Sequence, residues 1–255
     1  MEVQDCPLNL HLVAFWILLW PVLYVVFHFA CSVVLTDTQS QISSVLAFKM
    51  VCIVMSGWCA IWGVLSQNPS TEIGAEVAAV ATSAHGRLYG CSWHVMHCIL
   101  LPMAVHSFWE CVACVAIKDF REPLMIMHHA LIGTLGVFAF YPFALYYDSF
   151  FLGVCELSTF ALGFMDTFKR VPALQHQYPK TNEVSRVVFA LMFIAVRLIY
   201  WPFWSYSYWV DAVSFLLFSE PHQSGVLVFY LLSNVFMTGT LIPIAMYLDP
   251  YSNVP

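Results

Sequence analysis

Repeated apolar runs of membrane length limit what this chain can fold into more than any other feature of its sequence. A helix of about 20 apolar residues is long enough to cross the hydrocarbon core of a bilayer. About seven such runs cover residues 9–35, 43–65, 91–117, 124–147, 149–168, 186–201 and 225–248. Only 9% of the residues are charged and 61% are hydrophobic, whereas soluble domains are about 25% charged. The sequence therefore predicts an all-α, polytopic membrane helix bundle with about seven transmembrane helices.

The segments that join or end these runs carry further predictions. Residues 71–81 are expected to form a short surface helix, and residues 169–185 a basic loop with two prolines. The sixth run is expected to break at Trp201-Pro202, because the residue before a proline disfavours the helical conformation. Several aromatic side chains follow in a pattern typical of a membrane interface. They are Trp201, Trp204, Tyr206, Tyr208 and Trp209.

Positively charged residues are divided unevenly between the two sides that seven alternating spans create. Arg87 stands alone in the loops of one side. The other side carries Lys118, Arg121, Lys169, Arg170, Lys180 and Arg186. Because cytoplasmic loops are enriched in Lys and Arg, this basic side is expected to face the cytoplasm, with the N-terminus outside and the C-terminus inside. The net charge of −6 argues against nucleic acid as a partner.

The runs also predict how the chain is divided. Residues 1–42 are expected to hold an N-terminal transmembrane helix and a loop, residues 43–248 the main transmembrane domain, and residues 249–255 a short C-terminal tail. The first apolar run has no basic segment before it and exceeds the length of a signal-peptide core. We therefore expect this run to be retained as a membrane helix.

Glu156 and Arg197 are charged residues inside two of the apolar runs. About twelve residues separate Glu156 from the cytoplasmic end of its run, which corresponds to about 18 Å of helix. Arg197 lies at a similar depth in the sixth run. A lone charge near the bilayer centre is costly, whereas a hydrogen-bonded pair is tolerated, so the two side chains are predicted to approach each other. Such a pair either fixes helix register or anchors a lipid head group or carbonyl.

Two adjacent histidines open the fourth run. His128 and His129 lie about 7 Å from its cytoplasmic end, and Glu110 in the third run is expected at a similar depth. A histidine beside a carboxylate can act as a general base, so both histidines are candidate catalytic residues. His129 shares a helix face with Gly133 and Gly136, which permit close helix approach. The alternative is that the histidines only hydrogen-bond neighbouring helices.

The remaining histidines and cysteines argue against a metal centre. His94 and His97 lie at the opposite end of their run from the depth of the histidine pair, whereas the histidine boxes of membrane di-iron enzymes gather at one depth. His106 lies one turn before Glu110. Cys111 and Cys114 are spaced as a Cys-x-x-Cys pair but lack a second pair to complete a zinc site. We therefore expect no metal and no cofactor.

The order and spacing of these residues resemble those of the TLC-domain family, which includes the ceramide synthases. In that family a His-His pair opens one membrane helix, and an acidic motif follows on the next. The matching residues here are His128-His129, preceded by Lys118-Asp119-Phe120, then Glu156-Leu157-Ser158-Thr159-Phe160, with Arg197 and Pro202 in a later helix. The resemblance covers roughly residues 43–248 and implies a TLC-type bundle.

The acidic motif is similar to that of TLC-domain proteins that are not ceramide synthases. Ceramide synthases place a His-Asp pair, and another Asp three residues on, where this chain has Cys155-Glu156 and Thr159. The Glu-x-Ser-Thr form resembles the non-synthase members, whose roles concern membrane lipid composition. We expect a lipid-binding polar core that consists of Glu110, Glu156, Ser158, Thr159, Arg197 and Asn234.

Three functions are compatible with these residues. The first is an integral membrane protein that binds long-chain lipid and influences membrane lipid composition and homeostasis. The second is a divergent ceramide-synthase-type N-acyltransferase, in which His128 or His129 deprotonates the attacking amine and acyl-CoA is the substrate. The third is a structural accessory subunit that binds other membrane proteins. We favour the first, with membrane lipids as partners. The expected membrane is that of the endoplasmic reticulum, and another organelle membrane is the alternative.

Overall fold

The computed structural model describes residues 7–34, 40–138, 143–218 and 224–246, and every regular element in these ranges is helical. The α-helices are α1 (Leu10–Val34), α2 (Ser40–Ser66), α3 (Glu72–Val80), α4 (Ala84–Tyr89), α5 (Trp93–Val95), α6 (Leu101–Ala116), α7 (Pro123–Phe138), α8 (Leu145–Asp148), α9 (Glu156–Arg170), α10 (Pro172–Gln177), α11 (Pro179–Phe193), α12 (Trp201–Phe218) and α13 (Ser224–Met246). Shorter helical stretches of other types span Met96–Leu100, Lys118–Phe120, Ser149–Val154 and Ile194–Tyr200. The expected tail at 249–255 lies outside the described residues.

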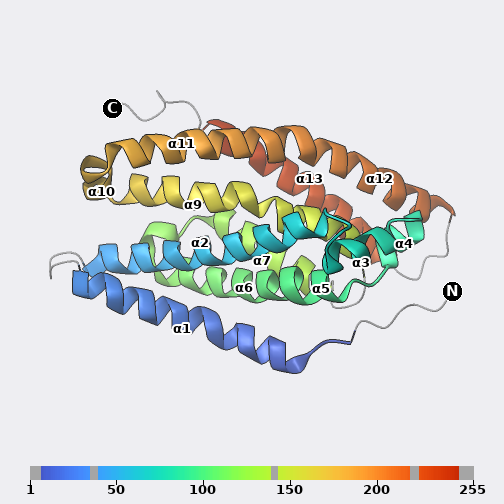
Figure 1. Cartoon of the computed structure of the whole chain (residues 1–255), viewed down its shortest axis with the longest axis horizontal. Helices are drawn as coiled ribbons and strands as arrows, with labels where there is room; N and C mark the ends of the chain where they lie inside the picture. The colour runs from blue at the N-terminus through green and yellow to red at the C-terminus, as the bar shows by residue number, and fades with distance from the viewer. Residues whose placement is uncertain (1–6, 35–39, 139–142, 219–223, 247–255) are drawn as a thin grey trace.

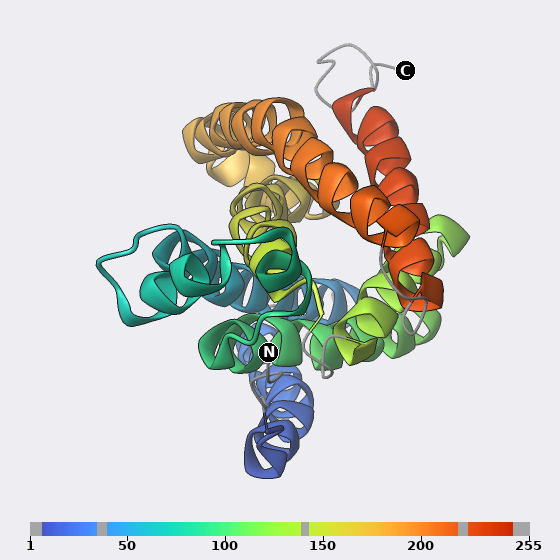
Figure 2. The same ribbon diagram turned by 90° about the vertical axis from the view of Figure 1, so that its right-hand side faces the viewer.

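The described part of the chain is a polytopic helical membrane bundle, as predicted. Five helical segments in it are long and apolar enough to cross a membrane: Leu10–Val33, Ile42–Ser66, Ala84–Ala116, Leu145–Arg170 and Pro179–Phe218. Two shorter apolar helices cover Pro123–Phe138 and Gly225–Thr240. Figure 1 shows the long helices lying along the longest axis of the molecule. Figure 2 shows α1 at the periphery, where it contacts α2 and α6.

With the spans numbered as the seven predicted runs, the second span (α2) and the fifth (Leu145–Arg170) cross with their backbones in contact. A Cβ atom built on Gly63 of α2 would overlap backbone atoms of Gly153 and Val154, and one built on Gly153 would lie 2.7 Å from the Cα atom of Gly63. Small residues allow such close approach between membrane helices, which gain little from the hydrophobic effect and associate largely through packing. This crossing therefore fixes how α2 sits against the segment that leads into α9.

The predicted break at Trp201-Pro202 is wrong, because the sixth span continues from Pro179 to Phe218. A π-helical stretch at Ile194–Tyr200 immediately precedes this dipeptide. Proline lacks the N–H that a regular α-helical pattern would use, and a π-helical turn changes the local hydrogen-bond spacing. The irregular stretch accommodates Pro202 without ending the helix.

The aromatic residues after this point do not form one interfacial belt as expected. Trp201 and Tyr208 are only 3% and 2% exposed, whereas Tyr206 is 71% exposed. Successive residues on a helix point in directions about 100° apart, so side chains so close in sequence cannot all face the same way. Two of the expected belt residues are therefore part of the protein core.

The boundary between the fourth and fifth spans lies earlier than predicted. Helix α7 ends at Phe138, and α8 begins at Leu145. Ala144 adopts the left-handed conformation with φ 57° and donates its N–H to the carbonyl of Leu88 at 2.6 Å. A left-handed residue cannot continue a right-handed helix. Tyr147 therefore belongs to the fifth span, not to the fourth.

Two polar connections between the spans contain helices, although only one of them was predicted to. The basic segment 169–185 is not a loop, because Pro172 and Pro179 each begin a helix, a position where the missing N–H of proline costs nothing. The expected surface helix is confirmed as α3. Its N-cap is Thr71, whose Oγ1 accepts the N–H of Gly74 at 3.1 Å.

Ion pairs lie at both ends of the bundle. At the end near α10, Lys49 Nζ lies 2.6 Å from Asp166 Oδ2, and Arg170 Nε lies 2.9 Å from the same oxygen. At the end near α4, the guanidinium of Arg87 forms two hydrogen bonds with Asp211, at 2.6 and 2.8 Å. The pair of Arg170 and Asp166 lies within α9. The other two join helices that are distant in sequence: Lys49 of α2 meets α9, and Arg87 and Asp211 are 124 residues apart.

Glu76 of α3 lies outside the membrane spans and makes a pH-dependent contact with residues of the third one. Its Oε2 accepts hydrogen bonds from Ser92 Oγ at 2.7 Å and from the His94 N–H at 3.2 Å, and its Oε1 lies 2.8 Å from His94 Nδ1. Partial burial acts in the opposite direction, but these bonds together lower the pKa of Glu76 below its ordinary value of 4.5. A carboxylate whose pKa is lower in the folded state stabilises the fold above the unfolded value.

Glu76→Gln is expected to lower the thermal midpoint in detergent at pH 7. The difference from the wild type should shrink as the pH falls below 4.5 through the folded-state pKa, because the contribution of the ionised carboxylate is then lost in the wild type as well. Thermal unfolding of both proteins over a pH series measures this. A difference that stays constant into acid would show that ionisation of Glu76 contributes nothing.

Candidate functional site

Glu110 of α6 is the meeting point of side chains from three helices. Its Oε2 lies 2.7 Å from Nδ1 of His129 on α7 and 3.3 Å from Nδ1 of His106, one turn away on α6. The Sγ of Cys52 on α2 donates to Oε1 at 3.2 Å. Glu110 itself is 7% exposed. The carboxylate therefore sits inside the bundle with two imidazoles and a thiol around it.

Small residues bring α7 close enough for His129 to reach Glu110. A Cβ atom on Gly136 would lie 2.5 Å from that of Ala104, and one on Gly133 would lie 3.1 Å from the ring of Phe108. Both neighbours belong to α6. The helix face that carries His129 and these glycines thus packs on α6, as expected from their spacing.

Arg197 connects the sixth span to the start of α9. Its Nε donates to Ser158 Oγ at 3.1 Å. Its Nη2 donates to the carbonyl of Cys155 at 3.4 Å and to Thr159 Oγ1 at 3.5 Å, and lies 4.0 Å from Glu156 Oε1. The expected approach of Glu156 and Arg197 is therefore present, although 4.0 Å is too long for a direct hydrogen bond. The serine and threonine that follow Glu156 hold the guanidinium beside it.

The two groups of side chains form one polar centre, which we define as Glu110, His128, His129, Glu156 and Arg197. The rings of His128 and His129 meet edge to face at 5.3 Å. The charge of Glu156 lies near enough to His129, and that of Arg197 near enough to His128, to act on these imidazoles. The polar centre thus draws on α6, α7, α9 and the stretch between α11 and α12. Their roles in lipid binding or catalysis stay predictions.

His128 differs from its neighbour His129 in how it is held. Among the described residues it forms no hydrogen bond, and it is partly exposed. Its neighbour His129, by contrast, is fixed by Glu110 at 2.7 Å. Adjacent residues on a helix point in different directions, so only one of the two imidazoles is oriented by the carboxylate.

Other expected residues lie elsewhere. Asn234 accepts from Trp209 Nε1 at 3.1 Å and donates to Ser205 Oγ at 3.2 Å, so its hydrogen bonds join α13 to α12 and do not reach the polar centre. His94 pairs with Glu76, and His97 Nε2 accepts the N–H of Asn9 at 3.1 Å. The histidines at this end are therefore in structural contacts.

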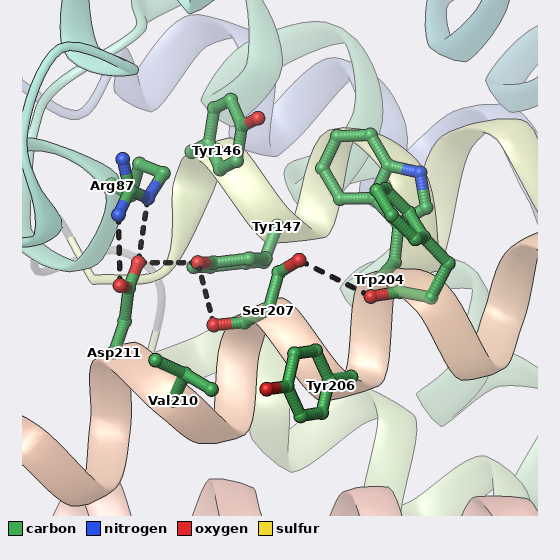
Figure 3. Close-up of a pocket in the computed structure, with 9 residues that line it drawn as sticks. Arg87, Tyr146, Tyr147, Trp204, Tyr206, Ser207, Val210 and Asp211 are labelled. Atoms are coloured by element: carbon green, nitrogen blue, oxygen red, sulfur yellow. Dashed lines mark hydrogen bonds and ion pairs between the residues drawn. The ribbon is translucent and has the colours of Figure 1, made fainter.

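A separate pocket of about 380 Å³ lies at the end of the bundle near α4. Figure 3 shows Tyr147 pointing at Asp211, which also faces Arg87. The Tyr147 hydroxyl donates to Asp211 Oδ2 at 2.5 Å. The rest of the lining is mostly aromatic: Tyr146, Phe203, Trp204, Tyr206, Ser207 and Val210. Sequence reasoning missed this group, although Arg87 stood out as the lone cation in the loops of its side.

An apolar helical bundle that encloses an acid, an arginine and paired imidazoles defines a class of membrane-embedded protein with a polar interior. Residues 41–247 match the family model of the TLC domain, which is more than half of the chain. The chain therefore belongs to the TLC-domain family. Comparison with curated proteins and with solved structures gave no match.

Proposed function

We propose that this TLC-domain membrane protein binds a long-chain lipid at the polar centre and thereby influences the lipid composition of its membrane. The observation that carries the proposal is the incomplete hydrogen bonding of Arg197. Its Nη1 has no hydrogen-bond partner among the described residues, and the nearest carboxylate oxygen of Glu156 is 4.0 Å away. Unused guanidinium donors inside an apolar bundle favour an oxygen-bearing ligand.

A membrane lipid fits both parts of this environment. A phosphate or carbonyl oxygen of the lipid would accept from Arg197, and the acyl chains would contact the surrounding apolar side chains. Ser158 and Thr159 accept hydrogen bonds from the other two nitrogens of the guanidinium, Nε and Nη2, and so hold it in place. The endoplasmic reticulum is the membrane we propose, with the end that carries Lys118 and Arg170 on the cytoplasmic side.

Arg197→Lys is expected to weaken lipid binding by roughly tenfold, because loss of one charge-assisted hydrogen bond costs about 1.5 kcal/mol. Lysine keeps the charge but lacks the planar fork of donors. Native mass spectrometry of the detergent-purified protein, followed by lipid extraction, measures the occupancy and identifies the lipid. Arg87→Lys makes the same change at the other end of the bundle and should leave occupancy unchanged. Equal occupancy in both variants, or no bound lipid in the wild type, would refute the proposal.

The second candidate function is acyl transfer, favoured by the contact between His129 and Glu110. A carboxylate 2.7 Å from one ring nitrogen orients an imidazole so that the other nitrogen can take a proton. In this reaction the amine attacks the acyl-CoA thioester, an amide bond forms, and coenzyme A leaves as the thiol. Amide formation by the purified protein from acyl-CoA and a long-chain amine distinguishes this function from lipid binding alone.

A further inference from the structure

The strongest unassigned feature is the group formed by Cys52 of α2 with His106 and Glu110 of α6, here called the Cys52–His106–Glu110 cluster. One sulfur, one nitrogen and one oxygen atom of these residues all lie within 4.8 Å of one another. His106 and Glu110 are four residues apart, so they share one face of α6. The third residue comes from a different helix. The cluster is therefore a convergence of donor atoms created by the packing of α2 on α6.

His106 is a buried imidazole whose ring nitrogens form no hydrogen bond among the described residues. It is 0% exposed, and its Nδ1 lies 3.3 Å from Glu110 Oε2. Trp20 contacts the ring edge to face at 5.1 Å, and Trp109 lies 5.5 Å away. Buried polar groups normally have partners, and leaving them unpaired is costly. The packed aromatic rings thus hold the imidazole of His106 next to a carboxylate and a thiol, and both ring nitrogens are left without a hydrogen bond.

In contrast to the expectation from the sequence, we propose that the Cys52–His106–Glu110 cluster binds one Zn²⁺ ion. Sulfur, imidazole nitrogen and carboxylate oxygen together suit zinc, whereas magnesium and calcium prefer oxygen ligands alone. Binding would release the thiol proton of Cys52 to water, since the thiolate is the ligand. Zinc with one thiolate, one carboxylate and one neutral imidazole carries no net charge, which suits the interior of a membrane protein.

His129 would support the site without binding the metal. Its Nδ1 lies 2.7 Å from Glu110 Oε2, whereas the thiol of Cys52 faces the other oxygen, Oε1. Imidazoles that hydrogen-bond a ligating carboxylate orient it and tune the metal. Three protein ligands would leave the fourth zinc position for water or for an oxygen of a ligand. This inference does not depend on lipid binding at Arg197.

The test measures metal in the full-length protein, purified in detergent without a polyhistidine tag. After exposure to zinc and removal of excess, we expect about one zinc per chain. Cys52→Ala and His106→Ala should reduce zinc to the background. Cys114→Ala is the matched control, because it removes the thiol of another cysteine in the same apolar cluster as Cys52 and should leave the zinc content unchanged. Wild-type protein without zinc, or undiminished zinc in Cys52→Ala, would overturn the proposal.

Two further measurements remain decisive even if the alanine variants do not fold. Cobalt added to metal-free wild-type protein should produce a thiolate-to-cobalt charge-transfer band, and its absence would contradict ligation by Cys52. His129→Gln should still bind one zinc at saturation but about 10- to 100-fold more weakly. Unchanged zinc affinity in this variant would show that His129 does not orient Glu110 for metal binding. Lipid occupancy, measured on the same samples, tests the proposed function separately.

Discussion

Gly63→Ala is expected to destabilise the protein by about 3 kcal/mol or more, at or beyond the upper range for overpacking a core. The added methyl group would overlap backbone atoms of Gly153 and Val154, and backbone cannot move aside as a flexible side chain can. The helices would have to separate along the whole crossing. Thermal unfolding of the detergent-purified protein measures the loss.

Gly239→Ala is the matched control for this prediction. Gly239 also lies within a helix, but a Cβ atom there would have no neighbour within 4 Å. Alanine is favoured over glycine in a helix interior by about 1 kcal/mol, so this variant should be as stable as the wild type or slightly more so. If Gly63→Ala and Gly239→Ala behave alike, the backbone contact between the second and fifth spans is not present in the folded protein.

Arg197→Met is expected to destabilise the protein by about 3–5 kcal/mol, because it leaves the buried carboxylate of Glu156 without a compensating charge. Arg197 and Glu156 have side-chain exposures of only 11% and 9%. The substitution also removes the donors to Ser158 and to the carbonyl of Cys155. A large fall in the thermal midpoint in detergent should result.

Two companion variants separate the charge effect from general disruption. Replacing Arg197 and Glu156 together, with Met and Leu, should recover much of the loss, since removing both members of a buried pair is often nearly neutral. Arg186 lies on the same continuous helix as Arg197, but it makes no ion pair within the described residues. Arg186→Met should therefore shift the free energy of unfolding by no more than about 0.5 kcal/mol. A double variant no more stable than Arg197→Met would argue that the charges of Arg197 and Glu156 are not coupled.

The sequence predicts which side chains of the polar centre lie at the same depth in the membrane. Glu156 and Arg197 lie at similar distances from the same side in their spans, and their side chains do approach. The same reasoning paired Glu110 with the histidines of the next span, and Glu110 meets His129. The prediction that Asn234 belongs to the polar core is not met, because its hydrogen bonds are to α12. The depth of a residue does not determine the direction in which its side chain points around the helix.

Local irregularities of the backbone were the part of the fold that could not be predicted. Pro202 predicts a break in the helix, whereas the helix continues past it after a π-helical stretch at Ile194–Tyr200. Ala144 ends one connection in the left-handed conformation, although alanine gives no sequence signal for that geometry. Such features are set by the contacts around them, here a hydrogen bond from Ala144 to Leu88, and not by intrinsic preference.

The sequence by itself determined that this chain crosses a membrane several times as helices, because apolar runs of that length satisfy both the bilayer and the backbone hydrogen bonds. It also determined the order of the acid, the arginine and the paired histidines along the spans. Only the tertiary structure decided that Cys52 and His106 meet at Glu110. That convergence depends on how the helices are rotated and how closely they approach, and both are set by packing at contacts such as Gly63 against Gly153.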